Sequence, residues 1–161
     1  MTGKIDPVHV SAKADYAVRA LAELVVMTTG TTGHVSVEQL AVRQGLPVKF
    51  LEAIFTELRK DGLVVSRRGA DGGYRLARDP STISVADVMR AVDGPLAAVR
   101  GLRPEDTVYG GAAEALPRVW IALRAATRNV LERVSLAELA TGDLPMSVLE
   151  LTDDPTAWER R

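Results

Sequence analysis

The side chains best suited to chemistry in this sequence are four arginines beside a glycine-rich turn. Arg67 and Arg68 precede the turn at residues 70–73, and Arg75 and Arg78 follow it. Arginine binds phosphate through a planar fork of donors and can also enter a narrow minor groove. Glycine lets backbone N–H groups approach a phosphate closely. This stretch is therefore suited to contacting a nucleic-acid backbone, although a glycine-tipped turn by itself is generic.

A β-hairpin is the element that would carry these arginines. Residues 63–67 and 74–77 are β-prone and enclose the turn, which predicts two antiparallel strands. The hairpin follows a predicted helix that has Pro47 in its first turn and ends at Asp61 and Gly62. The inward stripe of that helix consists of Val48, Leu51, Ile54, Phe55 and Leu58.

The outward face of the same helix is mixed in character. It carries Lys49, Glu52, Ala53, Thr56, Arg59 and Lys60, which can contact base edges and phosphates. For a lone helix, a solvated surface is the ordinary interpretation. A capping box at residues 36–39, however, opens a preceding helix that closes at Gly45, and the order helix, short turn, helix, hairpin indicates a winged helix-turn-helix. Residues 43–78 also hold eight basic residues against four acidic ones, which favours DNA as the partner.

Two further helices complete the predicted domain. Apolar periodicity over residues 14–28 predicts a further helix, with Ser11 or a nearby residue as its cap. It should pack beneath the recognition helix, which is the second helix of the helix-turn-helix and precedes the hairpin. A capping box at residues 84–87 opens a helix that ends at Gly94 and Pro95. We therefore expect a mainly α fold with a small β-hairpin wing, in which residues 1–95 form the winged helix-turn-helix DNA-binding domain.

The rest of the chain predicts an element for self-association. Residues 96–111 are expected to form a connecting loop, and residues 143–161 a flexible tail. Between them, residues 112–142 predict a long dimerisation helix, running to about Val134, and a short turn with its own capping box. The expected dimerisation face consists of Leu116, Val119, Trp120, Leu123, Thr127, Val130, Leu131 and Val134. Pairing of this helix with its twin would cover that face, and the alternative is that the helix folds back on its own domain.

Composition narrows the classes of function. The 161 residues carry a net charge of −1, which argues against a general nucleic-acid coat. The chain has no cysteine and two histidines, so it offers no thiolate for zinc or an iron–sulfur cluster, and we expect no metal and no cofactor. Glu105 and Asp106 could offer oxygen ligands, but adjacent acids in a loop are usually solvated. Catalytic motifs, a signal peptide and a long apolar run are missing from the sequence, so we expect a cytoplasmic protein that is not an enzyme and contacts no membrane.

Motifs at residues 11–21, 51–55, 58–64, 68–76 and 88–95 carry a family resemblance. The most specific are the Arg-Gly-x-x-Gly-Gly-Tyr wing and the Val-Asp-Gly-Pro helix end. Together they resemble the Rrf-two family of bacterial transcription regulators, which includes the iron–sulfur cluster regulator IscR and the nitric-oxide sensor NsrR. The resemblance covers most of residues 11–139.

The resemblance implies homodimers with crossed long helices, in which each winged helix-turn-helix binds one half of a pseudo-palindromic operator. It places Lys49, Phe50, Glu52 and Ala53 where the family's recognition helix contacts bases and backbone, and Arg68 and Gly69 where the wing enters the minor groove. The full candidate DNA-binding set is Lys13, Lys49, Phe50, Glu52, Ala53, Arg59, Arg67, Arg68, Gly69, Gly72, Gly73 and Tyr74.

The chain departs from the family pattern at two places. Asp15 stands where a basic residue is common, which leaves Lys13 as the first helix's candidate for a phosphate contact. Cluster-binding relatives place three cysteines between the Asp-Gly-Pro and the long helix, whereas residues 96–114 contain none. We therefore expect a homodimeric, sequence-specific repressor without a cluster. Three interpretations stay open for residues 96–111, namely a vestigial loop, a pocket for an unknown small-molecule effector, or a docking surface for another protein. The alternative is a winged-helix module that regulates through a partner protein rather than by binding DNA itself.

Overall fold

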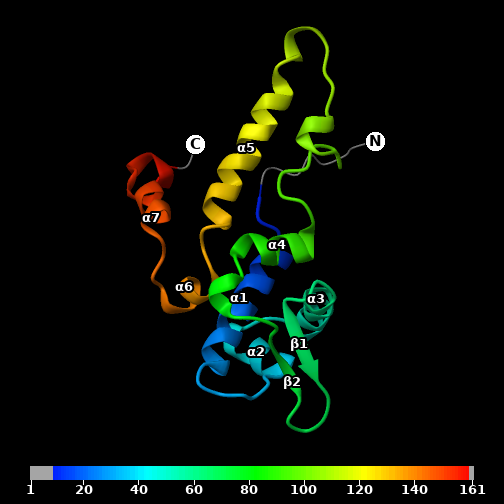
Figure 1. The fold of residues 1–161 in the computed structure, drawn as a ribbon, viewed down its shortest axis with the longest axis vertical. Helices are drawn as coiled ribbons and strands as arrows, with labels where there is room; N and C mark the ends of the chain where they lie inside the picture. Colours follow the sequence, from blue (N-terminus) through cyan, green and yellow to red (C-terminus); the bar gives the residue numbers. More distant parts are fainter. Residues whose placement is uncertain (1–8, 160–161) are drawn as a thin grey trace.

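The computed structural model describes residues 9–159 and shows a mainly helical chain with one two-stranded hairpin (Figure 1). The helices are α1 (Ala12–Thr28), α2 (Val37–Gln44), α3 (Val48–Lys60), α4 (Val85–Asp93), α5 (Leu116–Leu131), α6 (Leu136–Thr141) and α7 (Met146–Asp153). The strands are β1 (Val64–Arg67) and β2 (Gly73–Leu76), and single 3-10 turns lie at Pro80–Thr82, Pro104–Asp106, Gly111–Ala113 and Pro155–Trp158. The predicted fold class is confirmed.

Local hydrogen bonds fix the ends of the first helices as the sequence predicts. The Ser11 hydroxyl accepts from the N–H of Ala14 and caps α1. At α2 the Ser36 side chain and the Gln39 side chain each bond the other's backbone N–H, and Gly45 closes the helix in a left-handed conformation at φ 62°. One detail differs at α3, because Pro47 is the N-cap residue just outside the helix rather than part of its first turn.

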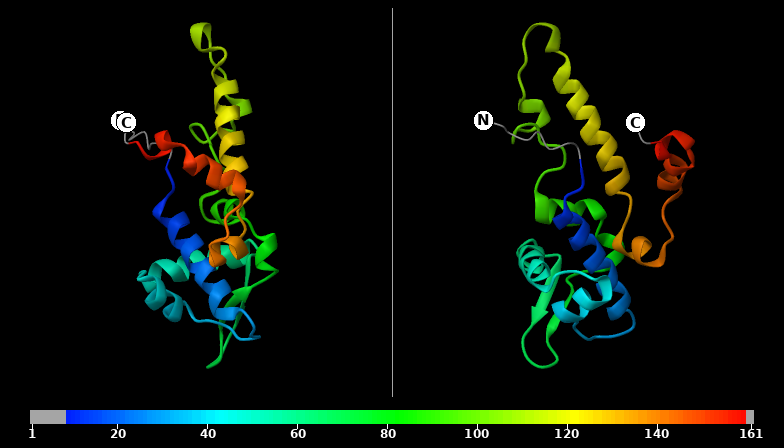
Figure 2. Two further views of the ribbon diagram at one scale, coloured as in Figure 1. Left: turned by 90° about the vertical axis from the view of Figure 1, so that its left-hand side faces the viewer. Right: turned by 180° about the vertical axis from the view of Figure 1, so that it is seen from behind.

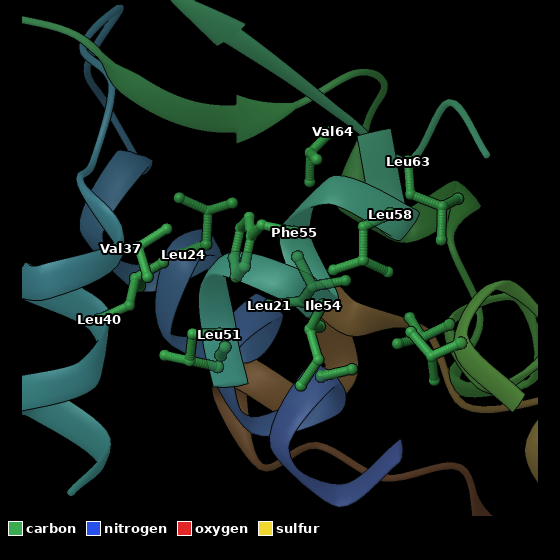
Figure 3. Close-up of a cluster of buried hydrophobic side chains, with 14 of the residues drawn as sticks. Leu21, Leu24, Val37, Leu40, Leu51, Ile54, Phe55, Leu58, Leu63 and Val64 are labelled. Atoms are coloured by element: carbon green, nitrogen blue, oxygen red, sulfur yellow. The ribbon is translucent and has the colours of Figure 1, made fainter. Parts of the chain in front are cut away.

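The hydrophobic core lies where α1, α2 and α3 meet (Figure 3). Leu51, Ile54, Phe55 and Leu58 of α3 are almost completely buried there, and Val48 is half-buried. The side chains that meet this stripe are Leu21, Leu24, Leu40, Leu63 and Val64, which come from α1, α2 and the start of the hairpin (Figure 3). Burying the stripe orients α3, so that its opposite face points to solvent.

The hairpin is joined to the segment before α2 as well as to itself. β1 and β2 pair antiparallel with Val64 opposite Leu76 and Arg67 opposite Gly73. Tyr74 also exchanges two backbone hydrogen bonds with Val35, at 2.9 and 2.8 Å. The wing therefore starts from a rigid base, because its second strand is held on both edges.

The chain returns to the winged-helix core after α5. The backbones of Ser84 and Ser135 form an isolated bridge, and α6 lies against α1. Leu136 is fully buried and Val134 is 7% exposed, three residues beyond the end of α5. The short element predicted after the long helix is therefore packed against the winged-helix domain.

The long helix α5 projects away from that domain (Figures 1 and 2). The connection between α4 and α5 runs alongside the helix in the opposite direction and turns back where α5 begins. Helix α5 ends at Leu131, which is shorter than the predicted end near Val134. The segment expected to be a flexible tail contains α7, whose side chains are half-buried or exposed. Across residues 9–159, no helix has both the length and the apolar content needed to cross a bilayer.

Candidate nucleic-acid interface

The outward face of α3 is open to solvent near its beginning. Lys49, Glu52 and Ala53 are exposed, and Phe50 is 62% exposed. Tyr16 of α1 meets the Phe50 ring edge to face, with ring centroids 6.4 Å apart. The face thus offers a cation, a carboxylate and an aromatic ring, which can contact phosphates, base amino groups and thymine methyl groups.

Polar contacts between α1 and α2 hold the helix that precedes α3. Glu23 accepts hydrogen bonds from Arg43 and Gln44, both at 2.8 Å, and Arg19 donates to the carbonyl oxygen of Gln44 at 2.5 Å. The hydrogen bond from Arg43 holds the pKa of Glu23 below its usual range. The carboxylate is therefore charged at neutral pH and fixes the spacing of the two helices behind the recognition helix.

The wing presents its first two arginines to solvent. Arg67 and Arg68 are exposed, and Gly69 follows at φ 109° with open space where a side chain would stand. Gly72, by contrast, has no room for a side chain, because a Cβ there would lie 2.3 Å from the carbonyl oxygen of Arg67. The turn can thus hold the arginines at its entrance only if glycine stands at residue 72.

A side-chain hydrogen bond joins α3 to the wing. The guanidinium of Arg59 donates to the hydroxyl of Ser66 at 3.3 Å, and Arg59 remains exposed. The sequence offered no signal for this pairing, because Ser66 is an ordinary strand residue in the alternating pattern. The contact links the two elements expected to enter neighbouring grooves.

Three predicted DNA-binding residues have structural duties in the fold. Lys13 pairs with Glu57 at 2.6 Å and donates to the carbonyl oxygen of Val92 at 2.6 Å. Tyr74 is half-buried with its ring 4.8 Å from that of Phe55, and Gly73 lies against the backbone of Val35. Their contact with DNA stays a prediction, and these contacts give a sufficient reason for each residue type without it.

The predicted dimerisation face divides into free and occupied parts. Val119 is 55% exposed, and no residue of α5, which lies wholly within the described chain, is buried. Trp120 instead donates to the hydroxyl of Tyr109 at 3.1 Å, within the same chain. Leu131 packs against the core, and Val134 is buried in it, so the assignment of Val134 to a dimer face is corrected. The most exposed part of the face is Val119, near the start of α5.

Comparison with known proteins agrees with this geometry. The sequence model of the Rrf2 family, described as iron-dependent transcriptional regulators, matches residues 10–142. The chain belongs to the Rrf2 family. The resemblance inferred from its motifs is thereby confirmed, and so is the expectation of a regulator rather than an enzyme.

Several Rrf2 relatives match over nearly their full lengths. Rv1287 of Mycobacterium tuberculosis, which carries the name of an HTH-type transcriptional regulator, is 50% identical over 151 residues, covering 94% of this chain and 92% of its own. IscR of Yersinia pestis is 33% identical and covers 95% of this chain and 90% of its own. Among solved structures, CymR, the global cysteine regulator of B. subtilis, has a TM-score of 0.70 at 30% identity, covering 84% and 98% of the two chains. IscR of T. potens has a TM-score of 0.65 at 31% identity, covering 95% and 93%.

The donor set of this Rrf2 protein does not fit an iron–sulfur cluster. Such clusters are held mainly by cysteine thiolates, and the sequence contains no cysteine. Within residues 9–159, no three histidine, aspartate or glutamate side chains gather closely enough to hold a metal ion. Glu105 is instead paired with Arg124 at 2.7 Å, so its carboxylate is engaged by a cation of the protein itself.

The connection before α5 holds residues that the sequence did not single out. One cavity there is lined by several residues of the segment 94–105 and by four arginines, Arg90, Arg103, Arg124 and Arg128. Arg90 belongs to α4, Arg103 to the connection, and the other two to α5. No local pattern relates these elements, which explains why sequence reasoning missed the cluster.

Proposed function

We propose that this Rrf2 protein is a homodimeric repressor that binds a pseudo-palindromic operator without an iron–sulfur cluster. The observation that carries the proposal is the outward face of α3 beside the basic wing, joined to it by Arg59 and Ser66. In this arrangement α3 lies in the major groove, where Lys49 and Glu52 meet backbone and bases. Arg67 and Arg68 on the wing reach the adjacent minor groove.

A dimer is supported by the incompletely covered face of α5. Val119 is largely exposed there, and Leu123, Val130 and Thr127 are half-buried in a helix that projects from its own domain. An apolar face of this kind is stabilised when a second copy covers it, and a twofold pair presents two α3 helices to two half-sites. Occupation of a site that overlaps a promoter is sufficient for repression, and the protein would act beside the chromosome in the cytoplasm.

The test is binding of the purified protein to the DNA upstream of its own gene. We expect a shifted complex that survives excess nonspecific competitor DNA and contains two protomers per operator. In transcription with purified polymerase, adding the protein should lower the yield from that promoter. A protein that remains unbound at competitor levels tolerated by other specific regulators would contradict the proposal and favour a winged-helix module acting through a partner protein.

A further inference from the structure

A cavity of about 630 Å³ lies between the end of α4, the connection at residues 94–105 and the middle of α5. Ligand sites in proteins commonly have volumes of about 300–1,000 Å³, so a small organic molecule fits this space. Its apolar lining includes Pro95, Leu96, Leu102 and Pro104, and its polar lining is dominated by arginine. The cavity is distinct from the proposed DNA-binding face, which is formed by α3 and the wing.

The charge of the lining is strongly one-sided. Arg90, Arg103, Arg124 and Arg128 face a single lining carboxylate, Glu105. The backbone N–H of Glu105 and then the Arg124 guanidinium hold the pKa of this carboxyl below its usual range. Each guanidinium has five N–H donors, so an ion pair leaves donors that can bind another oxyanion.

The loop that supplies Gly101 and Leu102 to the cavity lining is a tight turn held by its own backbone hydrogen bonds. Val99 and Leu102 exchange two backbone hydrogen bonds of 2.9 Å around Arg100 and Gly101, which have φ values of 52° and 78°. Ala97 also has a positive φ, 58°. A left-handed conformation is unfavourable for a residue with a side chain, and such residues gather at sites that bind ligands.

The turn is anchored to the chain leading into α5. The Arg100 guanidinium lies 5.6 Å from the centre of the Tyr109 ring, and Tyr109 in turn accepts the hydrogen bond from Trp120. Thr107 is 4% exposed and donates to the carbonyl oxygen of Pro104 at 2.6 Å. These contacts hold the cavity wall against the helix that supplies Arg124 and Arg128.

We propose that this arginine-lined cavity binds a small organic anion with a carboxylate or phosphate group and an apolar body. Planar guanidinium groups match both oxyanions with paired hydrogen bonds, and the proline and leucine side chains cover the apolar part. Because charges converge from α4, the connection and α5, an anion with two negative charges suits the cavity better than one with a single charge.

Ion pairs connect the cavity to the base of the wing. Arg90 pairs with Glu132 after α5 and lies 3.7 Å from Asp87, and Asp87 also pairs with Arg78 at 3.6 Å. Arg78 follows β2 at the base of the wing. An anion that draws Arg90 into the cavity would weaken the pairing of Arg90 with Asp87 and Glu132, and thereby the linked pair of Asp87 and Arg78. The site is thereby suited to carry the regulatory signal, a role that rests on the proposed function as a DNA-binding repressor.

The test uses two rigid dianions, phenyl phosphate and phthalate, in calorimetric titrations of the full-length protein without DNA. We expect one of them to bind once per subunit, and the preferred probe identifies the oxyanion as phosphate or carboxylate. Arg103→Gln and Arg128→Gln should each weaken binding about tenfold, because each removes a charge-assisted hydrogen bond. Arg118→Gln is the matched control, since it removes the same charge from an exposed residue of α5 outside the cavity.

Saturation by neither probe would overturn the proposal, as would equal weakening by Arg118→Gln. These titrations contain no DNA, so they can be interpreted even if operator binding fails. With operator present, saturating probe should change the operator affinity of the wild-type protein, and Arg128→Gln should need about tenfold more probe for the same change. Unchanged affinity of the saturated wild type would overturn the regulatory role.

Discussion

Arg68 lies at the entrance to the turn of the wing, where its side chain contributes little to the fold. It is exposed, and it comes directly before Gly69, whose φ of 109° turns the chain. An arginine in a narrow minor groove is attracted by the negative potential of the two phosphate backbones. Its loss should therefore affect binding much more than stability.

We expect Arg68→Ala to weaken operator binding by about 1–3 kcal/mol, the range for an arginine at a groove. Stability should change by less than about 0.5 kcal/mol, because the side chain is exposed. Fluorescence anisotropy with labelled operator measures the first quantity, and urea unfolding the second. Arg133→Ala removes a comparable exposed arginine that lies after α5, outside the wing, and should retain wild-type affinity. Equal affinities of the Arg68 variant and the wild type would contradict the placement of the wing.

The fold requires glycine at residue 73, whether or not this residue contacts DNA. A Cβ at this position would lie 2.4 Å from the carbonyl oxygen of Val35, and the residue has a φ of 138°. Both the strain and the contact fall on backbone that forms the base of the wing, so no flexible side chain can move away to make room.

We expect Gly73→Ala to lower the free energy of unfolding by about 2 kcal/mol or more, since backbone strain and a steric clash add at this position. Gly69→Ala is the comparison, because Gly69 has a positive φ but open space around its missing Cβ. Gly69→Ala should lower the free energy of unfolding, measured by urea denaturation, by less than Gly73→Ala does. Equal losses would show that the contact with Val35 contributes nothing.

At the scale of elements, α5 differs from every helix of the winged-helix core. Helices α1 to α4 each bury a stripe, whereas all 16 residues of α5 are half-buried or exposed. Apolar side chains such as Val119 and Leu123 are thus only partly covered by the rest of the described chain. Desolvating this face gains free energy only when a second surface covers it.

We expect Val119→Asp to convert the dimer into a monomer, because a carboxylate buried without a partner costs several kcal/mol. Operator affinity should fall with it, since the two half-sites are then bound independently. Light scattering gives the mass. Ala125→Asp adds the same charge to an exposed position on another side of the helix and should remain dimeric. A dimeric Val119 variant would place the interface elsewhere.

At the scale of the whole molecule, polar contacts join the winged domain to the end of α5, in addition to the packing of Leu131 against the core. Arg90 of α4 pairs with Glu132, which follows α5, and the backbone N–H of Val85 donates to Val134 at 2.9 Å. The connection between α4 and α5, which contains no cysteine, adjoins these contacts. A signal that acts there can change the relative placement of the two parts without any redox chemistry of the protein's own residues.

We expect protein purified anaerobically, after supply of iron and sulfide, to be colourless, because carboxylates and two histidines cannot replace the thiolates that clusters require. Its operator affinity should be the same in air, with a chelator and with nitric oxide. Visible absorption spectroscopy and the anisotropy titration measure these two properties. A visible band that bleaches with nitric oxide while operator affinity changes would disprove a cluster-free regulator.

Local elements of this protein were predictable from the sequence because their causes lie within a few residues of each other. Ser36 and Ser84 cap helices through partners three positions away, and the stripe of α3 repeats every three or four residues. The hairpin register follows from its turn in the same way. The family resemblance rested on such local motifs, and the comparisons confirmed it.

Only the tertiary structure showed which candidate residues are exposed and which are engaged in contacts within the fold. It engaged Lys13 with Glu57, placed Val134 in the core, and required glycine at residue 73 through contact with Val35. It also brought together the four arginines of the cavity from three separate elements. Contacts of this kind join residues far apart along the chain, and they form only when burial of the shared apolar core brings the elements together, so no pattern of local spacing records them.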